Sequence, residues 1–299
     1  MAKIITPVVT ILDANEKPDL AGNRSVIDHL IAGGVDGILV LGSAGEFPNL
    51  SVQERLDFLR FYAEYTAGRV ELFAGTGCVS FQDTLTLSSA VLDMGYAAPM
   101  VIGPYYFGLD QEKIFLYYDR LAKSLKGDLY LYNFPPRSGH SIAPETAARL
   151  AEANSNIIGL KDSVTAFGHT NLVCQATVGR PFAVYSGFDD QFLLNLAAGG
   201  AGCIGALSNV VPELWSDLLR AANGGDPVRA IRLTGLIQKL MPLYDMDTNC
   251  SLLLKKLMRH RGLDIADTAV FPFNQMDEAV FQKAAALLDG VLAEYKSLL

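Results

Sequence analysis

The chain has 299 residues, of which half are hydrophobic and 19% are charged. That is ample apolar material for one large core, and a single α/β domain routinely uses about 250 residues. The net charge of −8 and the pI near 5.0 argue against a nucleic-acid partner, because phosphate binding needs a basic face. No long apolar run predicts a membrane span, and residues 1–10 lack the pattern of a signal peptide. We therefore expect a cytoplasmic protein with no membrane partner.

The cysteines and histidines are too scattered to form a recognisable site. No pair has the C-x-x-C, H-x-x-x-H or H-E-x-x-H spacing of a redox or zinc motif. We expect buried free thiols and no metal, which disfavours a metal-dependent aldolase or hydrolase. The residues concerned are Cys78, Cys174, Cys203, Cys250, His29, His140, His169 and His260.

In chain order, short apolar runs alternate with amphipathic helical patterns. The runs predict strands buried on both faces of a parallel sheet. Asn23 is expected to cap the first helix, and Ser51 with Glu54 forms a capping box before the second. Strands are predicted at residues 4–10, 37–41, 70–74, 98–102, 129–133, 157–161, 183–186 and 202–206. Helices between them are predicted at residues 23–32, 51–65, 80–93, 111–125, 144–153 and 190–198. Eight such units predict an α/β fold, a closed (β/α)8 TIM barrel.

Helical periodicity continues after the eighth predicted strand. It predicts helices at residues 212–222, 228–244, 251–260 and 277–298. We expect a barrel catalytic domain over residues 1–224 and a C-terminal helical extension over residues 225–299, packed on the barrel. A doubly wound open sheet is the alternative, since residues 200–205 fit G-x-G-x-x-G. These glycines follow a predicted helix and lead into a strand, which is the wrong context for a dinucleotide site.

Lys161 is the strongest catalytic candidate. In such barrels chemistry takes place where the strands end at the C-terminal face, and Lys161 closes the apolar run 156–161 there. The other lysines lie at the N-terminus, in turns or in helical patterns, where a solvated head is ordinary. Desolvation favours the neutral amine, which attacks a carbonyl to give an iminium. The alternative is a structural lysine paired with a carboxylate such as Glu46 or Asp162.

Four motifs at predicted strand ends carry a resemblance to a known family. They are Gly-Ser-Ala-Gly-Glu-Phe at 42–47, Tyr-Asn-Phe-Pro-Pro-Arg-Ser-Gly at 132–139, Gly-Leu-Lys-Asp-Ser at 159–163 and Tyr-Ser-Gly-Phe-Asp-Asp at 185–190. Together, and collinear over about the first 210 residues, they resemble the dihydrodipicolinate synthase/N-acetylneuraminate lyase family. Within this family, the sequences of the motifs resemble those of the 2-keto-3-deoxy sugar-acid aldolases most closely, and residues 244–248 extend that resemblance.

The resemblance implies roles for residues at the end of the barrel. Lys161 would form the Schiff base with pyruvate, and Tyr132 would act as general acid/base. Ser43 would relay protons to Tyr132. The amides of Ser43 and Ala44 are candidates to hold the pyruvate carboxylate as an anion nest. Ala44 departs from the family, where most relatives carry a second hydroxyl. Without this chemistry, Tyr132 would be a core aromatic and residues 42–46 a strand-to-helix turn.

Three further positions complete the implied site. Tyr106 matches a tyrosine that family members insert into a neighbouring subunit's site, which implies a homo-oligomer, a dimer or a homotetramer. It is otherwise part of an exposed aromatic patch used for association. Gly187 and Ile204 match positions whose backbone lies against the bound pyruvate.

Arg137 leaves the substrate open. It resembles the arginine with which dihydrodipicolinate synthases grip the carboxylate of the incoming aldehyde, a bidentate task suited to a guanidinium. Sugar-acid aldolases generally carry a small or apolar residue there. The alternative is a loop arginine in a surface ion pair.

The chemistry predicts a pyruvate-dependent lyase that needs no metal or organic cofactor, because the lysine is the electron sink. Our first choice is a 2-keto-3-deoxy aldonate aldolase, and the alternative is 4-hydroxy-tetrahydrodipicolinate synthase, acting on aspartate semialdehyde. A 2-keto-3-deoxy acid dehydratase, or a non-catalytic barrel that binds a 2-oxo acid, are further alternatives.

Overall fold

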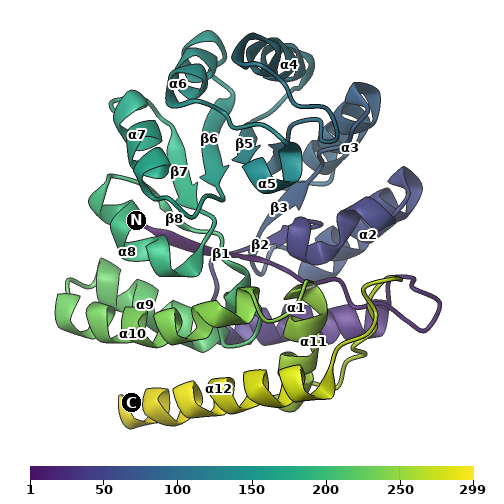
Figure 1. Ribbon diagram of the computed structural model, residues 1–299. Helices are drawn as coiled ribbons and strands as arrows, with labels where there is room; N and C mark the ends of the chain where they lie inside the picture. The colour runs from purple at the N-terminus through teal and green to yellow at the C-terminus, as the bar shows by residue number, and fades with distance from the viewer. Residues whose placement is uncertain (249) are drawn as a thin grey trace.

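The computed structural model describes residues 1–248 and 250–299. Eight parallel strands close into a barrel in sequence order, and helices surround it (Figure 1). The predicted (β/α)8 barrel is therefore confirmed. The strands are β1 Lys3–Pro7, β2 Gly37–Val40, β3 Glu71–Gly75, β4 Ala98–Ile102, β5 Leu129–Asn133, β6 Ile157–Asp162, β7 Ala183–Ser186 and β8 Gly202–Cys203. All eight lie where an apolar run predicts a strand, although the first and last are shorter than expected.

The barrel helices occupy the segments between the strands and the segment after β8. They are α1 Leu20–Gly33, α2 Val52–Thr66, α3 Phe81–Asp93, α4 Gln111–Ser124, α6 Pro144–Ala153, α7 Gly168–Ala176, α8 Phe192–Ala197 and α9 Pro212–Asn223. Short turns at strand ends are η1 Ser43–Gly45, η2 Phe47–Asn49, α5 Pro135–Ser138, η3 Asp189–Gln191 and η4 Ala206–Asn209. The capping box of Ser51 and Glu54 at α2 is confirmed.

One expectation about the helix caps was wrong, and one helix was not predicted. The cap of α1 is Asp19, whose side chain accepts from the amide of Ala21. Asn23 lies inside the helix, where it donates to the carbonyl of Ile11 and accepts from its amide, tying α1 to the segment after β1. The helix α7 was not predicted, because its sequence Gly-His-Thr-Asn-Leu-Val-Cys-Gln-Ala is short and opens with poor helix formers.

The C-terminal extension consists of α10 Pro227–Leu240, η5 Met241–Tyr244, α11 Cys250–His260 and α12 Glu278–Ser297. The predicted helix 228–244 is interrupted after Leu240, and Pro242 lies in the tighter turn that follows. In Figure 1, α10 and α12 lie outside α9, while α11 lies near the barrel end. The division into residues 1–224 and 225–299 stays a prediction, and α9 packs directly against α10 across it.

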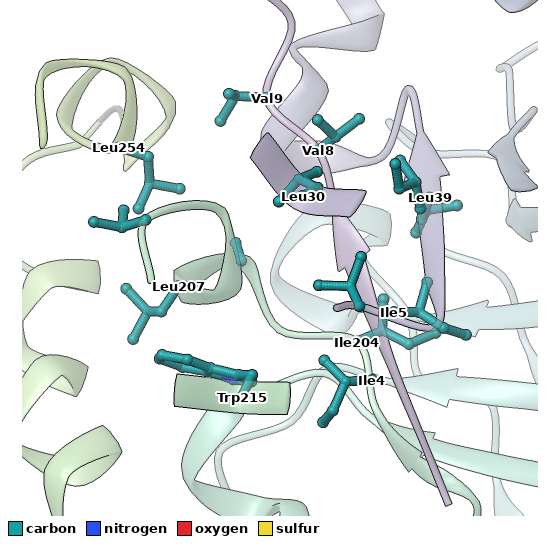
Figure 2. Close-up of a cluster of buried hydrophobic side chains, with 14 of the residues drawn as sticks. Ile4, Ile5, Val8, Val9, Leu30, Leu39, Ile204, Leu207, Trp215 and Leu254 are labelled. Atoms are coloured by element: carbon teal, nitrogen blue, oxygen red, sulfur yellow. The ribbon is translucent and has the colours of Figure 1, made fainter. Parts of the chain in front are cut away.

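One apolar cluster joins the barrel to the extension. Figure 2 shows part of this cluster, in which Ile5 of β1, Leu39 of β2, Trp215 of α9 and Leu254 of α11 take part. Each fully buried Leu or Ile contributes about 1.5–3 kcal/mol relative to exposure, so α11 is held by the same core as the strands. None of the helices in the described part of the chain has the length and apolar character that crossing a bilayer requires.

Candidate active site

A cavity of about 600 Å³ opens at the C-terminal ends of the strands. Seven of the eight predicted site residues line it, which are Ser43, Ala44, Tyr132, Arg137, Lys161, Gly187 and Ile204. They come from segments spread over more than half the chain, and the barrel closes these segments into one ring. The cavity is therefore the candidate active site.

Lys161 and Tyr132 are neighbours because β5 and β6 pair in register at these two residues. The Lys161 Nζ lies 4.5 Å from the centroid of the Tyr132 ring, and the Lys161 residue is only 4% exposed. Glu46 and Asp162, the two carboxylates considered as partners, bind other groups. Within the described residues, no carboxylate lies within 4.0 Å of the Lys161 ammonium. The amine is therefore buried beside a phenol and forms no ion pair with a carboxylate of residues 1–248 or 250–299.

Strand alternation explains why these two side chains face the cavity. Tyr132 belongs to the apolar cluster that also contains Tyr130 and Tyr185, whereas Leu131 and Leu160, one position earlier on each strand, belong to a separate cluster that includes residues of α4 and α6. Lys161 shares the inward face with its register partner. The sequence signal was thus an apolar strand whose last inward position carries a reactive group.

Ser43 stands at the start of η1, and its Oγ lies 3.3 Å from the Tyr132 hydroxyl. The amides of Ser43 and Ala44 lie at the N-terminal end of this turn. The first N–H groups of a helical turn have no carbonyl acceptor within the turn itself. Thr10 fixes the far end of the turn by donating to the carbonyl of Gly45 at 2.8 Å. The loop therefore brings a hydroxyl and two amides to the cavity beside the phenol.

A buried ion pair holds this loop to the extension. The Glu46 carboxylate binds the ammonium of Lys255 in α11 and accepts from the amide of Val270 at 3.4 Å. Lys255 also donates to the carbonyl of Thr268 at 2.8 Å. Lys255 is fully buried, which corrects the expectation that helical lysines are solvated. Burial lowers the pKa of Lys255, and Glu46 opposes that shift.

The extension forms the outer wall of the cavity, which sequence reasoning missed. Among the described residues, its contribution comes from the end of η5 and the residues that follow it, the start of α11, and the segment before α12. These residues are Tyr244, Asp245, Thr248, Cys250, Ser251, Val270 and Phe273. Tyr244 donates to Asp189 at 2.6 Å and accepts from the amide of Ala206 at 2.8 Å. Burial raises the pKa of Asp189 to about 6. The likeness at residues 244–248 was the only sequence signal for this wall.

Arg137 projects from α5 at the rim, with its guanidinium 5.9 Å from the centroid of the Phe134 ring. Among the described residues, no acidic side chain lies within 4.0 Å of the Arg137 guanidinium. The surface ion pair considered as an alternative is therefore not formed with any acidic residue in the described ranges. Of the described residues that line the cavity, Arg137 and Lys161 are the two that carry a cationic side chain.

Tyr106 does not line the cavity of its own chain. It is 86% exposed, has a φ of +94°, and packs edge-on against Phe107 at 4.9 Å between ring centroids. Its neighbour Tyr105 lines the cavity instead. A contribution of Tyr106 to another subunit's site stays a prediction.

No group of three or more His, Cys, Asp or Glu side chains in the described ranges is arranged to hold a metal ion. The four cysteines are free thiols, of which Cys78, Cys174 and Cys203 are buried.

Comparison with known proteins places the chain in a family. The dihydrodipicolinate synthetase family profile matches residues 1–290. "Probable 2-dehydro-3-deoxy-D-pentonate aldolase YjhH" of Escherichia coli (strain K12) is 32% identical over 293 residues, covering 97% of each chain. The 4-hydroxy-tetrahydrodipicolinate synthase of Azoarcus sp. (strain BH72) is 35% identical over 242 residues, covering 79% of this chain and 82% of the synthase.

Solved structures agree with the sequence comparisons. YagE, a prophage protein of the dihydrodipicolinic acid synthase family from E. coli K12, was determined in complex with pyruvate. It superposes with a TM-score of 0.94 at 31% identity, covering 97% of this chain and 98% of YagE. The resemblance inferred from four motifs is confirmed over nearly the whole chain. This chain belongs to the dihydrodipicolinate synthetase family and is one of its lyases.

Proposed function

We propose that the protein is a class I aldolase in which Lys161 forms a Schiff base with pyruvate or a pyruvate-derived 2-oxo acid. The observation that carries this proposal is the buried Lys161 amine, 4.5 Å from the Tyr132 ring and without a carboxylate partner among the described residues. A structural lysine at this depth would need a counter-ion. A nucleophile instead needs an accessible face, and the cavity supplies one.

In the cleavage direction, the amine adds to the C2 ketone and the resulting carbinolamine loses water to give an iminium. Removal of the proton from the C4 hydroxyl then breaks the C3–C4 bond, and the electron pair moves into an enamine. The aldehyde leaves, C3 takes up a proton, and water releases pyruvate. Each proton transfer needs a group within hydrogen-bond reach, and the Tyr132 hydroxyl with Ser43 supplies the relay. No metal or organic cofactor is required, because the iminium is the electron sink.

The pyruvate end of the substrate has a matching cradle. The amides of Ser43 and Ala44 suit a carboxylate, since consecutive N–H groups form an anion site. At Gly187 a Cβ would lie 2.0 Å from the Ser163 Oγ, so only glycine lets the backbone come this close. Gly187 and Ile204 would then lie against the pyruvate carbons.

For the aldehyde we propose a sugar-acid fragment, which makes the protein a 2-keto-3-deoxy aldonate aldolase. The sequences of the four motifs and the similarity of the chain to YjhH support this choice. Arg137 supports a second candidate, 4-hydroxy-tetrahydrodipicolinate synthase, because a rim guanidinium with no acidic partner among the described residues suits an aldehyde with a carboxylate. A dehydratase uses the same iminium to expel hydroxide.

We also propose a cytoplasmic homo-oligomer in which Tyr106 reaches a neighbouring subunit's cavity. The exposed ring and the left-handed backbone of Tyr106 support this proposal. Strained backbone conformations cluster at functional sites, and an exposed aromatic side chain suits a contact with a second subunit. The free thiols fit a reducing compartment.

Borohydride reduction in the presence of pyruvate, followed by intact-mass measurement, tests the amine chemistry. We expect one adduct per chain, located on Lys161 and absent from Lys161→Ala. Glyceraldehyde and aspartate semialdehyde, assayed side by side with pyruvate, then separate the two acceptors. Trapping without turnover of either aldehyde would favour the dehydratase, and no trapping would contradict the proposal.

A further inference from the structure

The residues that follow Tyr132 and Lys161 form a buried network behind them. Strand alternation turns Asn133 and Asp162 away from the cavity, and the same register that pairs Tyr132 with Lys161 pairs these two. Asn133 Nδ2 donates to Asp162 Oδ1 at 2.7 Å. This bond fixes the relative height of β5 and β6 at the position where the reacting side chains meet.

His169 of α7 closes the network from outside the barrel. Its Nδ1 lies 2.8 Å from Asp162 Oδ2, and its Nε2 lies 3.0 Å from the carbonyl oxygen of Ile142. A carboxylate and a carbonyl only accept, so both ring nitrogens must carry a proton for both bonds to form. That form is the imidazolium. The neutral alternative leaves Nε2 to accept from the Ser141 hydroxyl, which lies farther away at 3.5 Å.

Ile142 is held at both of its backbone groups. Its amide donates to Asn133 Oδ1 at 2.9 Å, while its carbonyl accepts from His169. A ring of bonds therefore runs from β5 through β6 and α7 to the segment before α6, and back to β5. Thr170 adds a third donor to Asp162, at 2.7 Å. With Asn133, His169 and Thr170 as donors, both oxygens of the buried Asp162 carboxylate are hydrogen-bonded.

We propose that His169 is a positioning residue, an imidazolium that donates to Asp162 and to the Ile142 carbonyl and so holds Tyr132 and Lys161 in their reacting register. The inference rests on the proposed function in one respect, namely that Tyr132 and Lys161 are the reacting residues. The charge of the ring rests on the geometry alone. Loss of the donor to Asp162 would loosen the end of β6, and loss of the donor to Ile142 would loosen the segment that holds Asn133. A displacement of about 1 Å at a reacting group costs up to about a hundred-fold in rate.

The surroundings favour the charged ring. The hydrogen bond to Asp162, followed by the charge of Asp162, raises the pKa of His169, and partial burial opposes the rise. The groups that face the ring or its carboxylate partner from the packed elements are Asp162 of β6, Ser141 and the carbonyl of Ile142, Glu145 of α6, and Thr170 and Cys174 of α7. Because the folded pKa is raised, the stabilisation is complete below the pKa of an unfolded histidine. It is lost as the pH rises through the folded value.

Two variants and a control test the inference. His169→Phe removes both donors, and His169→Asn retains one that can reach Asp162. His29→Asn is the matched control, because His29 also lies on a barrel helix and bonds a backbone carbonyl, that of Asn209, beside β1 and β8. The rate of adduct formation with pyruvate, trapped by cyanoborohydride, is measured from pH 6 to pH 9 together with KM and kcat.

We expect kcat to fall about ten-fold in His169→Phe and less in His169→Asn, with KM for pyruvate nearly unchanged. The ratio of the wild-type kcat to that of each His169 variant should fall as the pH rises, because the wild-type ring loses its charge and the variants have none to lose. The His29→Asn control should follow wild type at every pH. Equal rates and pH profiles in wild type and both variants would overturn the inference.

Long-range ¹H–¹⁵N spectra of wild-type protein labelled at histidine report the protonation state of the His169 ring directly. This measurement does not depend on whether the variants fold. Two protonated nitrogens at pH 7 support the inference, and a neutral tautomer from pH 6 upward overturns it. This readout needs no substrate. Failure of wild type to form any adduct would therefore remove the proposed function without being confused with a wrong charge state for His169.

Discussion

The inner and outer halves of the cavity are built in different ways. The inner half consists of strand ends, where β5 and β6 place neighbouring residues that are 29 positions apart in the chain, as in the Asn133–Asp162 pair. The outer half depends on contacts across most of the chain, such as Glu46 with Lys255, 209 positions apart, and Glu46 with Val270, 224 apart. The barrel therefore supplies the amine and the phenol, while the extension supplies the wall against which an aldehyde would lie.

This difference separates chemistry from acceptor choice. Changes at the inner residues should lower kcat with every aldehyde, because each substrate passes through the same iminium. Changes at the outer residues should alter KM for particular aldehydes or the stability of the fold. Variants that violate this division would show that the two halves act as one unit.

The largest effect is expected at the inner amine. Lys161→Arg keeps a cation at the same strand end and removes the nucleophile, since a guanidinium stays protonated. We expect activity to fall by about four orders of magnitude or more, with no pyruvate adduct and an unchanged melting temperature. Steady-state assays, intact mass and thermal unfolding measure these three quantities. Retained turnover in a folded variant would assign the chemistry to another group.

The phenol should come next. Tyr132→Phe keeps the ring beside Lys161 and removes the proton relay to Ser43. We expect kcat to fall about 10²–10⁴-fold, the usual contribution of general acid/base catalysis, with pyruvate still trapped slowly. Tyr118→Phe is the control, because its hydroxyl is buried against the carbonyl of Val101 outside the cavity. A similar loss of kcat in both variants would indicate that the hydroxyl of Tyr132 matters for packing alone.

Breaking the Glu46–Lys255 pair, which links the two halves, should lower the free energy of unfolding more than it lowers kcat. Lys255→Met leaves the Glu46 carboxylate buried without its cation, and such a loss typically costs about 3–5 kcal/mol. The double variant Lys255→Met/Glu46→Gln should recover part of that cost. Urea unfolding measures the free energies, with Lys239→Met as the control, since the exposed Lys239–Glu294 pair contributes about 0–1 kcal/mol. Equal costs in the two single variants would mean that the buried pair is not a structural link.

The same division explains how much the sequence could reveal. The strands were predictable because each is a continuous apolar run, a local signal, and the register then follows from barrel closure. Lys161 stood out because it ends such a run. The burial of Lys255 was not predictable in this way, because its partner Glu46 lies on a loop far away in the chain. The run Leu252-Leu253-Leu254 before it was the single local hint.

The network around His169 was missed for a related reason. Asp162, which bonds His169, and Asn133, which bonds Asp162, each follow a residue already chosen as catalytic, so strand alternation alone placed them behind the site. His169 itself lies on α7, the helix that the pattern failed to predict. Its role became visible when the fold brought α7 against the end of β6.

The smallest effect is expected at the outer rim and concerns which aldehyde is used. Arg137→Ala should raise KM about ten-fold for an aldehyde that carries a carboxylate, and change it little for a neutral hydroxy-aldehyde. Arg149→Ala is the control, because Arg149 also lies over a phenylalanine ring, Phe115 at 4.4 Å, but on α6 away from the cavity. Aspartate semialdehyde and glyceraldehyde, each titrated at saturating pyruvate, give the two values of KM. If both stay at wild-type levels while kcat falls, Arg137 acts on the inner half, and the separation of chemistry from acceptor choice is wrong at this residue.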